Sequence, residues 1–225
     1  DAVKFLAVNG PELVDSFLID KAGVDFSRND NGEIDRTMEA AHSVRRIYHV
    51  HDTTGKSIES SLVSYAAKCK SIHIFSRHIA IDLITNTHNS IDSQERYRRK
   101  IVIGAYVFDL QKETVDIFFA PSVIIATGGI GNLYLHTSNP HGSTGDGIAM
   151  ASRIGAEIIN AEYVQFHPTI LFHRDVDRFL ITESLRGEGA RLRNKRGGYF
   201  MEKYAPEEKD LAPRDEVSRA IFREM

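Results

Sequence analysis

Residues 165–169, 182–190 and 211–215 read QFHPT, TESLRGEGA and LAPRD, three polar motifs within one stretch from Ala161 to Arg219. Their side chains are of the types that bind or protonate a carboxylate. His and Thr donate hydrogen bonds to carboxylate oxygens, and Arg donates two in parallel. A Glu between two Arg can pass a proton along. Each residue alone is more simply explained as part of a charged, solvated surface, but their grouping favours a site for a carboxylate substrate.

The composition is that of an ordinary globular protein. The 225 residues suffice for one large domain or two small ones. Hydrophobic residues make up 42% of the chain and charged residues 26%, which is typical of globular proteins. The net charge of −3 argues against a nucleic-acid binder, which shows a basic excess. Cys69 is the only cysteine, so no internal disulfide forms, and this fits a reducing compartment.

The apolar runs are short. None approaches the roughly 20 residues that a membrane helix needs, and we expect neither a membrane segment nor a signal peptide in this sequence. The sequence starts at Asp1 rather than at a methionine, so we expect its true beginning to be missing.

Hydrophobic periodicity predicts a chain of mixed α/β class. The first helix is expected to be capped by Asn9, with Pro11 in its first turn. The short run Val123–Ala126 is wholly apolar, as expected for a strand buried on both faces. The expected helices are at 9–19, 54–68 and 148–154, and the expected strands at 72–76, 78–85, 101–110, 114–119 and 123–126, with a hairpin turn near 111–112.

Two glycine-containing segments are candidates for backbone contact with a ligand. Thr127 and Gly128 follow the run 123–126, and glycine lets a ligand approach the main chain closely. Asp146 precedes a predicted helix, where it either caps the helix or contacts a hydroxyl-rich ligand. No G-x-G-x-x-G occurs, so the usual pyrophosphate-binding turn is missing. No Cys and His residues have metal-ligand spacing, and we expect no metal.

In their order and spacing, the three motifs resemble those of the succinate dehydrogenase and fumarate reductase flavoprotein superfamily, and most of all its L-aspartate oxidase branch. The resemblance extends from about Val24 to Met225. It implies FAD as the cofactor and an internal fragment of a longer flavoprotein. Residues 1–160 would be part of a Rossmann-type FAD-binding domain with an inserted β excursion, lacking the glycine-rich unit. Residues 161–225 would be the first half of an α+β substrate-capping domain.

The resemblance also implies a role for each matching residue. Arg214 would exchange a proton with the substrate, and Glu183 and Arg186 would relay protons to it. Glu39, in EAAHS where the branch has EGGHS, would meet the amino group of the substrate. The other implied substrate contacts are His167, Thr182 and Glu183, and the expected cofactor contacts are Asp146, Ile79, Ala80, Thr127 and Gly128.

Glu39 and LAPRD separate the branches of the superfamily. Succinate dehydrogenases typically have a non-acidic residue at the position of Glu39, LASRD in place of LAPRD, and glycine in place of Ile170. A carboxylate near C2 suits a substrate that carries an ammonium group, which succinate lacks. The resemblance therefore implies cytoplasmic oxidation of L-aspartate to iminoaspartate for de novo NAD synthesis. Fumarate or oxygen would be the electron acceptor, and quinolinate synthase would act downstream.

Two alternatives to the L-aspartate oxidase interpretation remain open from the sequence. The first is the flavoprotein subunit of a membrane-attached succinate dehydrogenase or fumarate reductase. The second is an inactive, truncated fragment that acts at most as an interaction module. Ala40 and Ala41, which replace the two glycines of EGGHS, also leave open how the backbone runs beside Glu39.

Overall fold

The computed structural model of the chain describes residues 1–39, 42–88 and 90–225, so Ala40 and Ala41 lie outside the described residues. The chain forms two compact units. The first comprises residues 1–74, 166–169 and 181–225, and the second residues 75–165 and 170–180. Both contain helices and strands, which confirms the mixed α/β class. The functional division after residue 160 stays a prediction. No helix in the described part is both long and apolar enough to cross a membrane.

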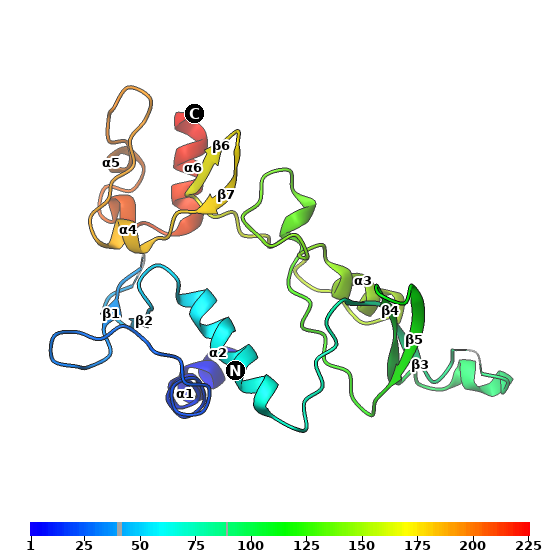
Figure 1. Cartoon of the computed structure of the whole chain (residues 1–225). Coiled ribbons are helices and arrows are strands. Elements are labelled where there is room, and N and C mark those ends of the chain that lie inside the picture. Colours follow the sequence, from blue (N-terminus) through cyan, green and yellow to red (C-terminus); the bar gives the residue numbers. More distant parts are fainter. Residues whose placement is uncertain (40–41, 89) are drawn as a thin grey trace. The chain divides into compact units, whose positions relative to one another are not determined.

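The first unit is built mainly from helices (Figure 1). Its small strands β1 and β2 pair in antiparallel fashion. The predicted helix at 54–68 is confirmed with the same bounds. The helices are α1 (Ala2–Leu13), α2 (Thr54–Lys68), α4 (Ser184–Gly187), α5 (Met201–Tyr204) and α6 (Arg214–Glu224), and the strands are β1 (Arg36–Thr37) and β2 (Ile47–Tyr48).

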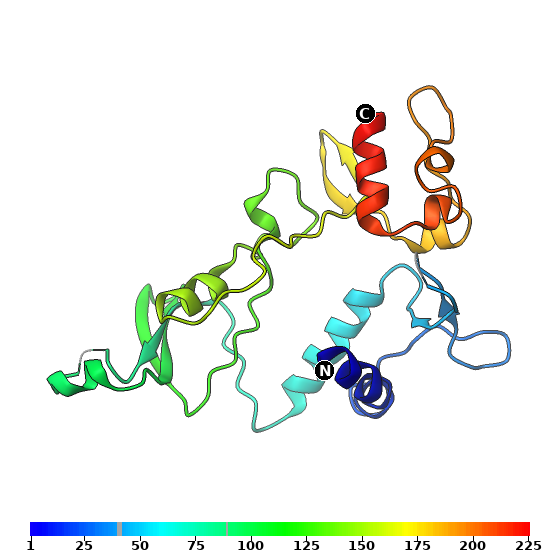
Figure 2. The same ribbon diagram turned by 180° about the vertical axis from the view of Figure 1, so that it is seen from behind.

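The buried residues of this unit cluster around α5 and α6, which contact each other. Figures 1 and 2 show this end of the chain from opposite sides. Met201, Ala212 and Val217 have no exposed surface, and Ala220 has 1%. Val217 and Ala220 are three residues apart and so share one face of α6. Arg214 stands at the first position of the same helix, one turn before Val217. Burial of that face therefore fixes the start of α6, from which Arg214 projects.

The first helix begins earlier than predicted. It starts at Ala2, and Asn9 lies inside it and donates a hydrogen bond to the carbonyl oxygen of Phe5 at 2.8 Å, so Asn9 is not a cap. Pro11 is also inside the helix, where it has no N–H to donate and its ring crowds the preceding turn. The chain continues as a π-helix from Val14 to Ile19. This helix, which has wider turns than an α-helix, begins three residues after the proline.

The second unit contains a three-stranded antiparallel sheet with the order β3-β4-β5, and α3 contacts β3 (Figure 1). The predicted hairpin is confirmed. Asp109 holds its turn, because Oδ1 accepts the backbone N–H groups of Gln111 and Lys112 at 2.8 and 3.2 Å. The elements are β3 (His78–Thr85), β4 (Val102–Asp109), β5 (Thr114–Phe119), α3 (Asp146–Arg153) and the antiparallel pair β6 (Ile170–His173) and β7 (Val176–Leu180).

Two predicted strands are wrong. Residues 72–76 and 123–126 form no strand, and Ile124, expected to be buried on both faces, is 90% exposed. A strand needs a neighbour with free backbone groups along its length. Among the described residues, no strand pairs with either segment. An apolar or alternating pattern predicts the tendency of a segment to be extended, but it cannot supply the partner.

Candidate functional site

Glu183 is the centre of a charged cluster in the first unit. Its Oε1 accepts a hydrogen bond from Nη2 of Arg186 at 2.8 Å, and its Oε2 lies 3.0 Å from Nη2 of Arg214. The side chain of Glu183 is 3% exposed and that of Arg186 is 4% exposed, whereas that of Arg214 is 39% exposed. Burying a carboxylate is costly unless it is paired, and the two arginines pair both oxygens. The cluster thus connects a buried ion pair to an arginine that reaches solvent.

The short helix α4 brings the buried pair together. Glu183 precedes its first residue and Arg186 follows three positions later, so both lie on one side of the turn. Thr182 is exposed, and its Oγ1 accepts the backbone N–H of Ser184 at 3.3 Å. The hydroxyl of Thr182 therefore stabilises the start of α4 and lies beside Glu183.

Glu39 reaches the cluster from a distant part of the sequence. Its Oε2 lies 3.9 Å from Nη2 of Arg214, and its side chain is 29% exposed. Gly187 explains how this segment comes so close. A Cβ at position 187 would lie 2.4 Å from the carbonyl oxygen of Met38, so a side chain there would push the backbone away. The glycine in TESLRGEGA thus leaves space for the chain that carries Glu39.

The charges of the cluster affect the pKa of His167. Burial lowers the pKa of His167, and the positive charges of Arg214 and Arg186 lower it further, while the contact with Thr169 and the charge of Glu183 oppose them. Nδ1 lies 3.0 Å from the carbonyl oxygen of Thr169 and 3.2 Å from its backbone nitrogen. In the neutral tautomer that accepts the N–H of Thr169, Nε2 carries the proton. That nitrogen can donate to a carboxylate oxygen.

The five residues expected to contact the cofactor all lie in the second unit. Asp146 is the first residue of α3 and is exposed, and its Oδ1 accepts a hydrogen bond from Oγ1 of Thr144 at 3.0 Å. Gly145 occupies the cap position of this helix, with φ of 81°, and no side chain caps it. The alternative that Asp146 caps the helix is therefore wrong. Thr127 is tied to the same helix, because its Oγ1 accepts the N–H of Gly147 at 3.1 Å.

The main chain linked to α3 through Thr127 leaves room for the close approach of a ligand. Gly128 has φ of 76°, and a Cβ added at Gly129 would meet nothing within 4 Å. Ile79 and Ala80 are exposed on β3. An uncovered main chain without side chains permits close approach, and the exposed carboxylate of Asp146 can accept hydrogen bonds from hydroxyl groups. These residues fit a group such as FAD, which combines hydroxyl groups with a large planar surface.

Two residues that the sequence analysis missed support these elements. Asp210 accepts a hydrogen bond from Nη1 of Arg186 on its main-chain oxygen at 2.7 Å. It stands directly before LAPRD, so its place in the sequence was a usable signal. Arg153 of α3 donates from Nε to Oδ2 of Asp82 in β3 at 2.9 Å. Nothing in the local sequence links these two residues, because they are 71 positions apart.

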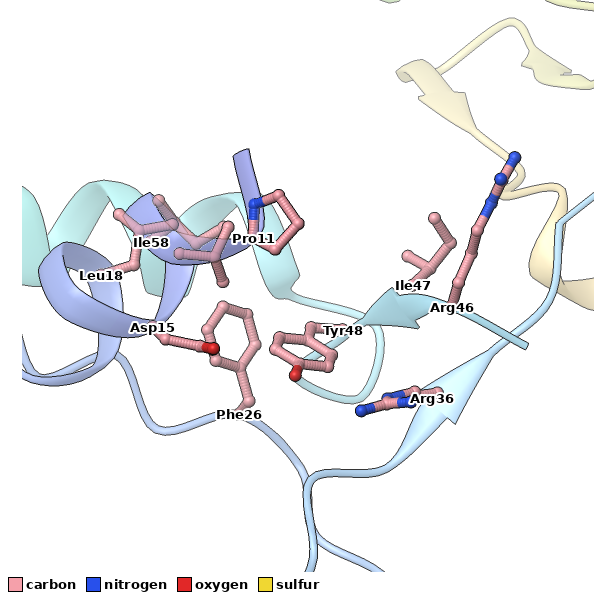
Figure 3. A pocket seen from close by; sticks show the side chains of 10 residues that line it. Pro11, Asp15, Leu18, Phe26, Arg36, Arg46, Ile47, Tyr48 and Ile58 are labelled. Carbon is pink, nitrogen blue, oxygen red and sulfur yellow. The ribbon is translucent and has the colours of Figure 1, made fainter. Parts of the chain in front are cut away.

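A pocket of about 400 Å³ lies elsewhere in the first unit (Figure 3). The rings of Phe26 and Tyr48 lie side by side in it, with centroids 5.4 Å apart, and Leu18 and Ile58 add apolar surface. None of the predicted substrate residues lines it. Its lining is mostly apolar, and its charged residues are Asp15, Arg36 and Arg46.

Comparison with known proteins gives a consistent result. The family model of the FAD binding domain matches residues 1–225. L-aspartate oxidase from Acinetobacter baylyi is 46% identical over 221 residues, which are 98% of this chain and 39% of that protein. L-aspartate oxidase from Yersinia pestis is 44% identical, and the match covers 100% of this chain and 42% of that protein. The chain thus spans about two fifths of the length of these relatives.

Solved structures of related flavoproteins share the fold. E. coli quinol fumarate reductase matches with a TM-score of 0.85 at 26% identity, over 99% of this chain and 37% of that chain. The Sdh1 complex of Mycobacterium smegmatis in its apo form matches with a TM-score of 0.67 at 31% identity, over 95% of this chain and 34% of that one. Because the family model matches every residue of the chain, this chain belongs to the FAD binding domain family.

Proposed function

We propose that the full-length protein containing this chain is an FAD-dependent L-aspartate oxidase. It oxidises L-aspartate to iminoaspartate in cytoplasmic de novo NAD synthesis, with fumarate or oxygen as electron acceptor and quinolinate synthase acting on the product. The names of relatives that are 46% and 44% identical support this assignment. The proposal extends from this chain to the longer protein, since the chain spans 39% and 42% of those relatives.

The position of Glu39 is the observation that carries the proposal. Its carboxylate lies 3.9 Å from the guanidinium of Arg214 and is partly exposed, so it faces the place where a substrate would meet that arginine. An acidic group at this point attracts an ammonium group and repels a third carboxylate. L-Aspartate carries an ammonium group on C2, whereas succinate carries none. Glu39 therefore favours the amino acid as substrate.

The carboxylates of the substrate would be held by His167, Thr182 and Arg214. His167 is neutral at neutral pH because its pKa is lowered, so in the tautomer with the proton on Nε2 it donates one hydrogen bond without adding charge. Thr182 offers an exposed hydroxyl at the start of α4. Arg214 offers the planar, doubly donating group that matches a carboxylate. Together they orient C2, and orientation of this kind removes much of the entropic part of a barrier.

Oxidation removes a hydride from C2 and a proton from the ammonium group, which leaves the C=N bond of the imine. When bound, FAD supplies the acceptor for the hydride. Reduction of fumarate is the other half-reaction, in which a hydride that the reduced cofactor would supply adds to one alkene carbon and a proton adds to the other. Arg214 would give that proton. Glu183, 3.0 Å from Arg214, and Arg186, 2.8 Å from Glu183, would return it.

The FAD itself would be held by the second unit. Asp146 would accept hydrogen bonds from its hydroxyl groups, the main chain at Thr127 and Gly128 would lie against it, and the backbone at Ile79 and Ala80 would lie beside its adenine end. The exposure of these residues and the missing side chain at Gly128 support these contacts.

A second candidate is the flavoprotein subunit of a succinate dehydrogenase or fumarate reductase. The structural likeness to E. coli quinol fumarate reductase, at a TM-score of 0.85, favours it. The sequence identity of 26% with that chain, against 46% with an L-aspartate oxidase, favours the first proposal. A third outcome, an inactive fragment, applies to the 225-residue chain expressed alone.

The full-length protein decides between these functions. After purification, its flavin content is measured by absorbance, and electron transfer is measured with L-aspartate or succinate as donor and fumarate or oxygen as acceptor. We expect oxidation of L-aspartate with both acceptors and none of succinate. Oxidation of succinate by a protein with covalently attached flavin would favour the second candidate. A protein that binds flavin but accepts neither donor would contradict both.

A further inference from the structure

The guanidinium of Arg186 is fixed by two acceptors. Nη2 donates to Oε1 of Glu183 at 2.8 Å, and Nη1 donates to the main-chain oxygen of Asp210 at 2.7 Å. Nε is buried and has no hydrogen-bond partner in residues 1–39, 42–88 and 90–225. With the side chain 4% exposed, water does not replace a lost contact readily. The orientation of the Arg186 guanidinium toward the carboxylate of Glu183 therefore depends on the position of the Asp210 carbonyl.

The carboxylate of Asp210 holds that carbonyl in place. Asp210 is 5% exposed and lies in the 3₁₀ turn Lys209–Leu211. Its Oδ1 accepts the backbone N–H of Leu192 at 2.7 Å, and its Oδ2 lies 3.4 Å from Nε of Arg191. Both contacts run to a segment 18 or 19 residues earlier in the chain. The side chain of Asp210 thus holds the 209–211 turn in place, while the main-chain oxygen of Asp210 binds Arg186.

The same turn leads directly to the second arginine of the cluster. Ala212, two residues after Asp210, has no exposed surface, and Arg214 then opens α6. A shift of the turn would move Arg186 and Arg214 together relative to Glu183. Because proton transfer requires heavy atoms within about 2.6–3.2 Å, small displacements here matter more for transfer than for binding.

We propose that Asp210 is a positioning residue for the proton relay: its carboxylate anchors the 209–211 turn, whose main chain orients Arg186 against Glu183 and sets the start of the helix that bears Arg214. This inference rests on the proposed function, because the relay is part of it. Asp210 touches neither substrate nor flavin in this scheme. It acts only through the two arginines.

The test compares three variants of the full-length flavoprotein. Asp210→Ala removes both side-chain contacts. Asp210→Asn keeps an oxygen for the N–H of Leu192 but loses the charge that Arg191 balances. Glu202→Ala is the matched control, because exposed Glu202 also pairs with Arg191, at 2.7 Å, and with Lys209 of the turn, at 3.7 Å, while its loss leaves the bond from Leu192 to Asp210 intact. Flavin content verifies folding of each variant.

The measurements are kcat, KM and the solvent isotope effect on kcat for fumarate reduction and L-aspartate oxidation. For Asp210→Ala we expect kcat for fumarate reduction to fall at least about tenfold, a part of the roughly 10²–10⁴-fold that general acid catalysis contributes. KM should change less than about threefold, and the solvent isotope effect should rise, because a displaced relay slows proton transfer and leaves uniform binding intact. Asp210→Asn should lie between wild type and Asp210→Ala, and Glu202→Ala should match wild type.

An unchanged kcat in Asp210→Ala, or a rise in KM alone, would overturn the proposal. If Asp210→Ala does not retain flavin, Asp210→Asn decides: a kcat and an isotope effect equal to those of wild type would overturn the proposal as well. Failure of the proposed function is a different result, since it would appear as absence of both activities in the wild-type protein.

Discussion

The half-exposed guanidinium of Arg214 lies 3.0 Å from the buried carboxylate of Glu183. Arginine is almost always protonated in water, so it is a poor base. To act as an acid, it needs a route by which the proton that it gives up is replaced. Glu183 is 3% exposed and therefore shielded from bulk water. Replacement would then follow the side chains of the cluster, and Arg214 would be the point at which the relay meets the substrate.

Replacing Arg214 is expected to abolish turnover without loss of flavin. In the full-length protein, Arg214→Leu should lower kcat by at least about 10²–10⁴-fold, the range that a general acid contributes. Arg214→Lys should retain a little activity, because an ammonium group donates a proton but lacks the planar fork. Steady-state kinetics and flavin absorbance provide the measurement. Near-normal kcat with raised KM in Arg214→Leu would reduce Arg214 to a binding residue.

Replacing Glu39 should separate the two half-reactions. Glu39→Gln removes the charge that would face the ammonium group, so oxidation of L-aspartate should fall far more than reduction of fumarate, which has no such group. Glu188→Gln is the control, since Glu188 pairs with Arg45 at 3.0 Å and both side chains are more than half exposed. Equal losses in both reactions of Glu39→Gln would remove the argument for an amino-acid substrate.

Gly187 should be intolerant of a methyl group. Alanine is normally favoured over glycine within a helix, so helix propensity alone predicts that Gly187→Ala stabilises the protein. The Cβ would lie 2.4 Å from the carbonyl oxygen of Met38, and overpacking of this kind costs about 1–3 kcal/mol. We expect a lower melting temperature and weaker discrimination between L-aspartate and succinate, because Glu39 follows Met38.

Gly55→Ala in α2 is the control, since a Cβ there meets nothing within 4 Å and should stabilise the protein instead. A melting temperature raised by both substitutions would contradict the predicted clash.

The pKa of His167 should respond to Arg214. Burial is the largest cause of its lowered pKa, and the charge of Arg214 also lowers it, so Arg214→Leu should raise the value measured by NMR of the imidazole ring. Because the folded-state pKa lies below the ordinary value of 6.5, the unfolded chain takes up its proton first on acidification. The contribution of His167 to stability is therefore complete above pH 6.5 and is lost as pH falls from 6.5 towards the folded-state pKa.

Arg223→Leu is the control for this titration, since Arg223 lies in the same helix as Arg214 and is not among the groups that act on His167. We expect it to leave the imidazole pKa unchanged. A pKa that stays the same in Arg214→Leu would mean that Arg214 is screened from His167.

The sequence predicted the residues of the charged cluster better than it predicted the strands. Glu183 and Arg186 are three residues apart, so a single helical turn brings them together. Glu39 and Arg214 are far apart in sequence, and only the resemblance of their motifs indicated a common site. Val123–Ala126 was mispredicted because a strand depends on a neighbour that the local pattern does not encode. Asp210 was missed because its main-chain oxygen, not its side chain, meets Arg186.

The irregular pairing of β3 with β4 has a consequence for how this protein can vary. Ala80 pairs with Val107 and Asp82 with Tyr106, so Ile81 is an extra residue in β3. Its carbonyl oxygen accepts Nη2 of Arg153 at 3.1 Å, beside the contact between Arg153 and Asp82. Exchange of Ile81 for another residue keeps that carbonyl, whereas deletion would close the bulge and remove the carbonyl that accepts from Arg153. The number of residues in β3 is therefore constrained at this point, whereas the type of side chain at position 81 is not. Substitutions of Ile81 should be tolerated, and insertions or deletions should not.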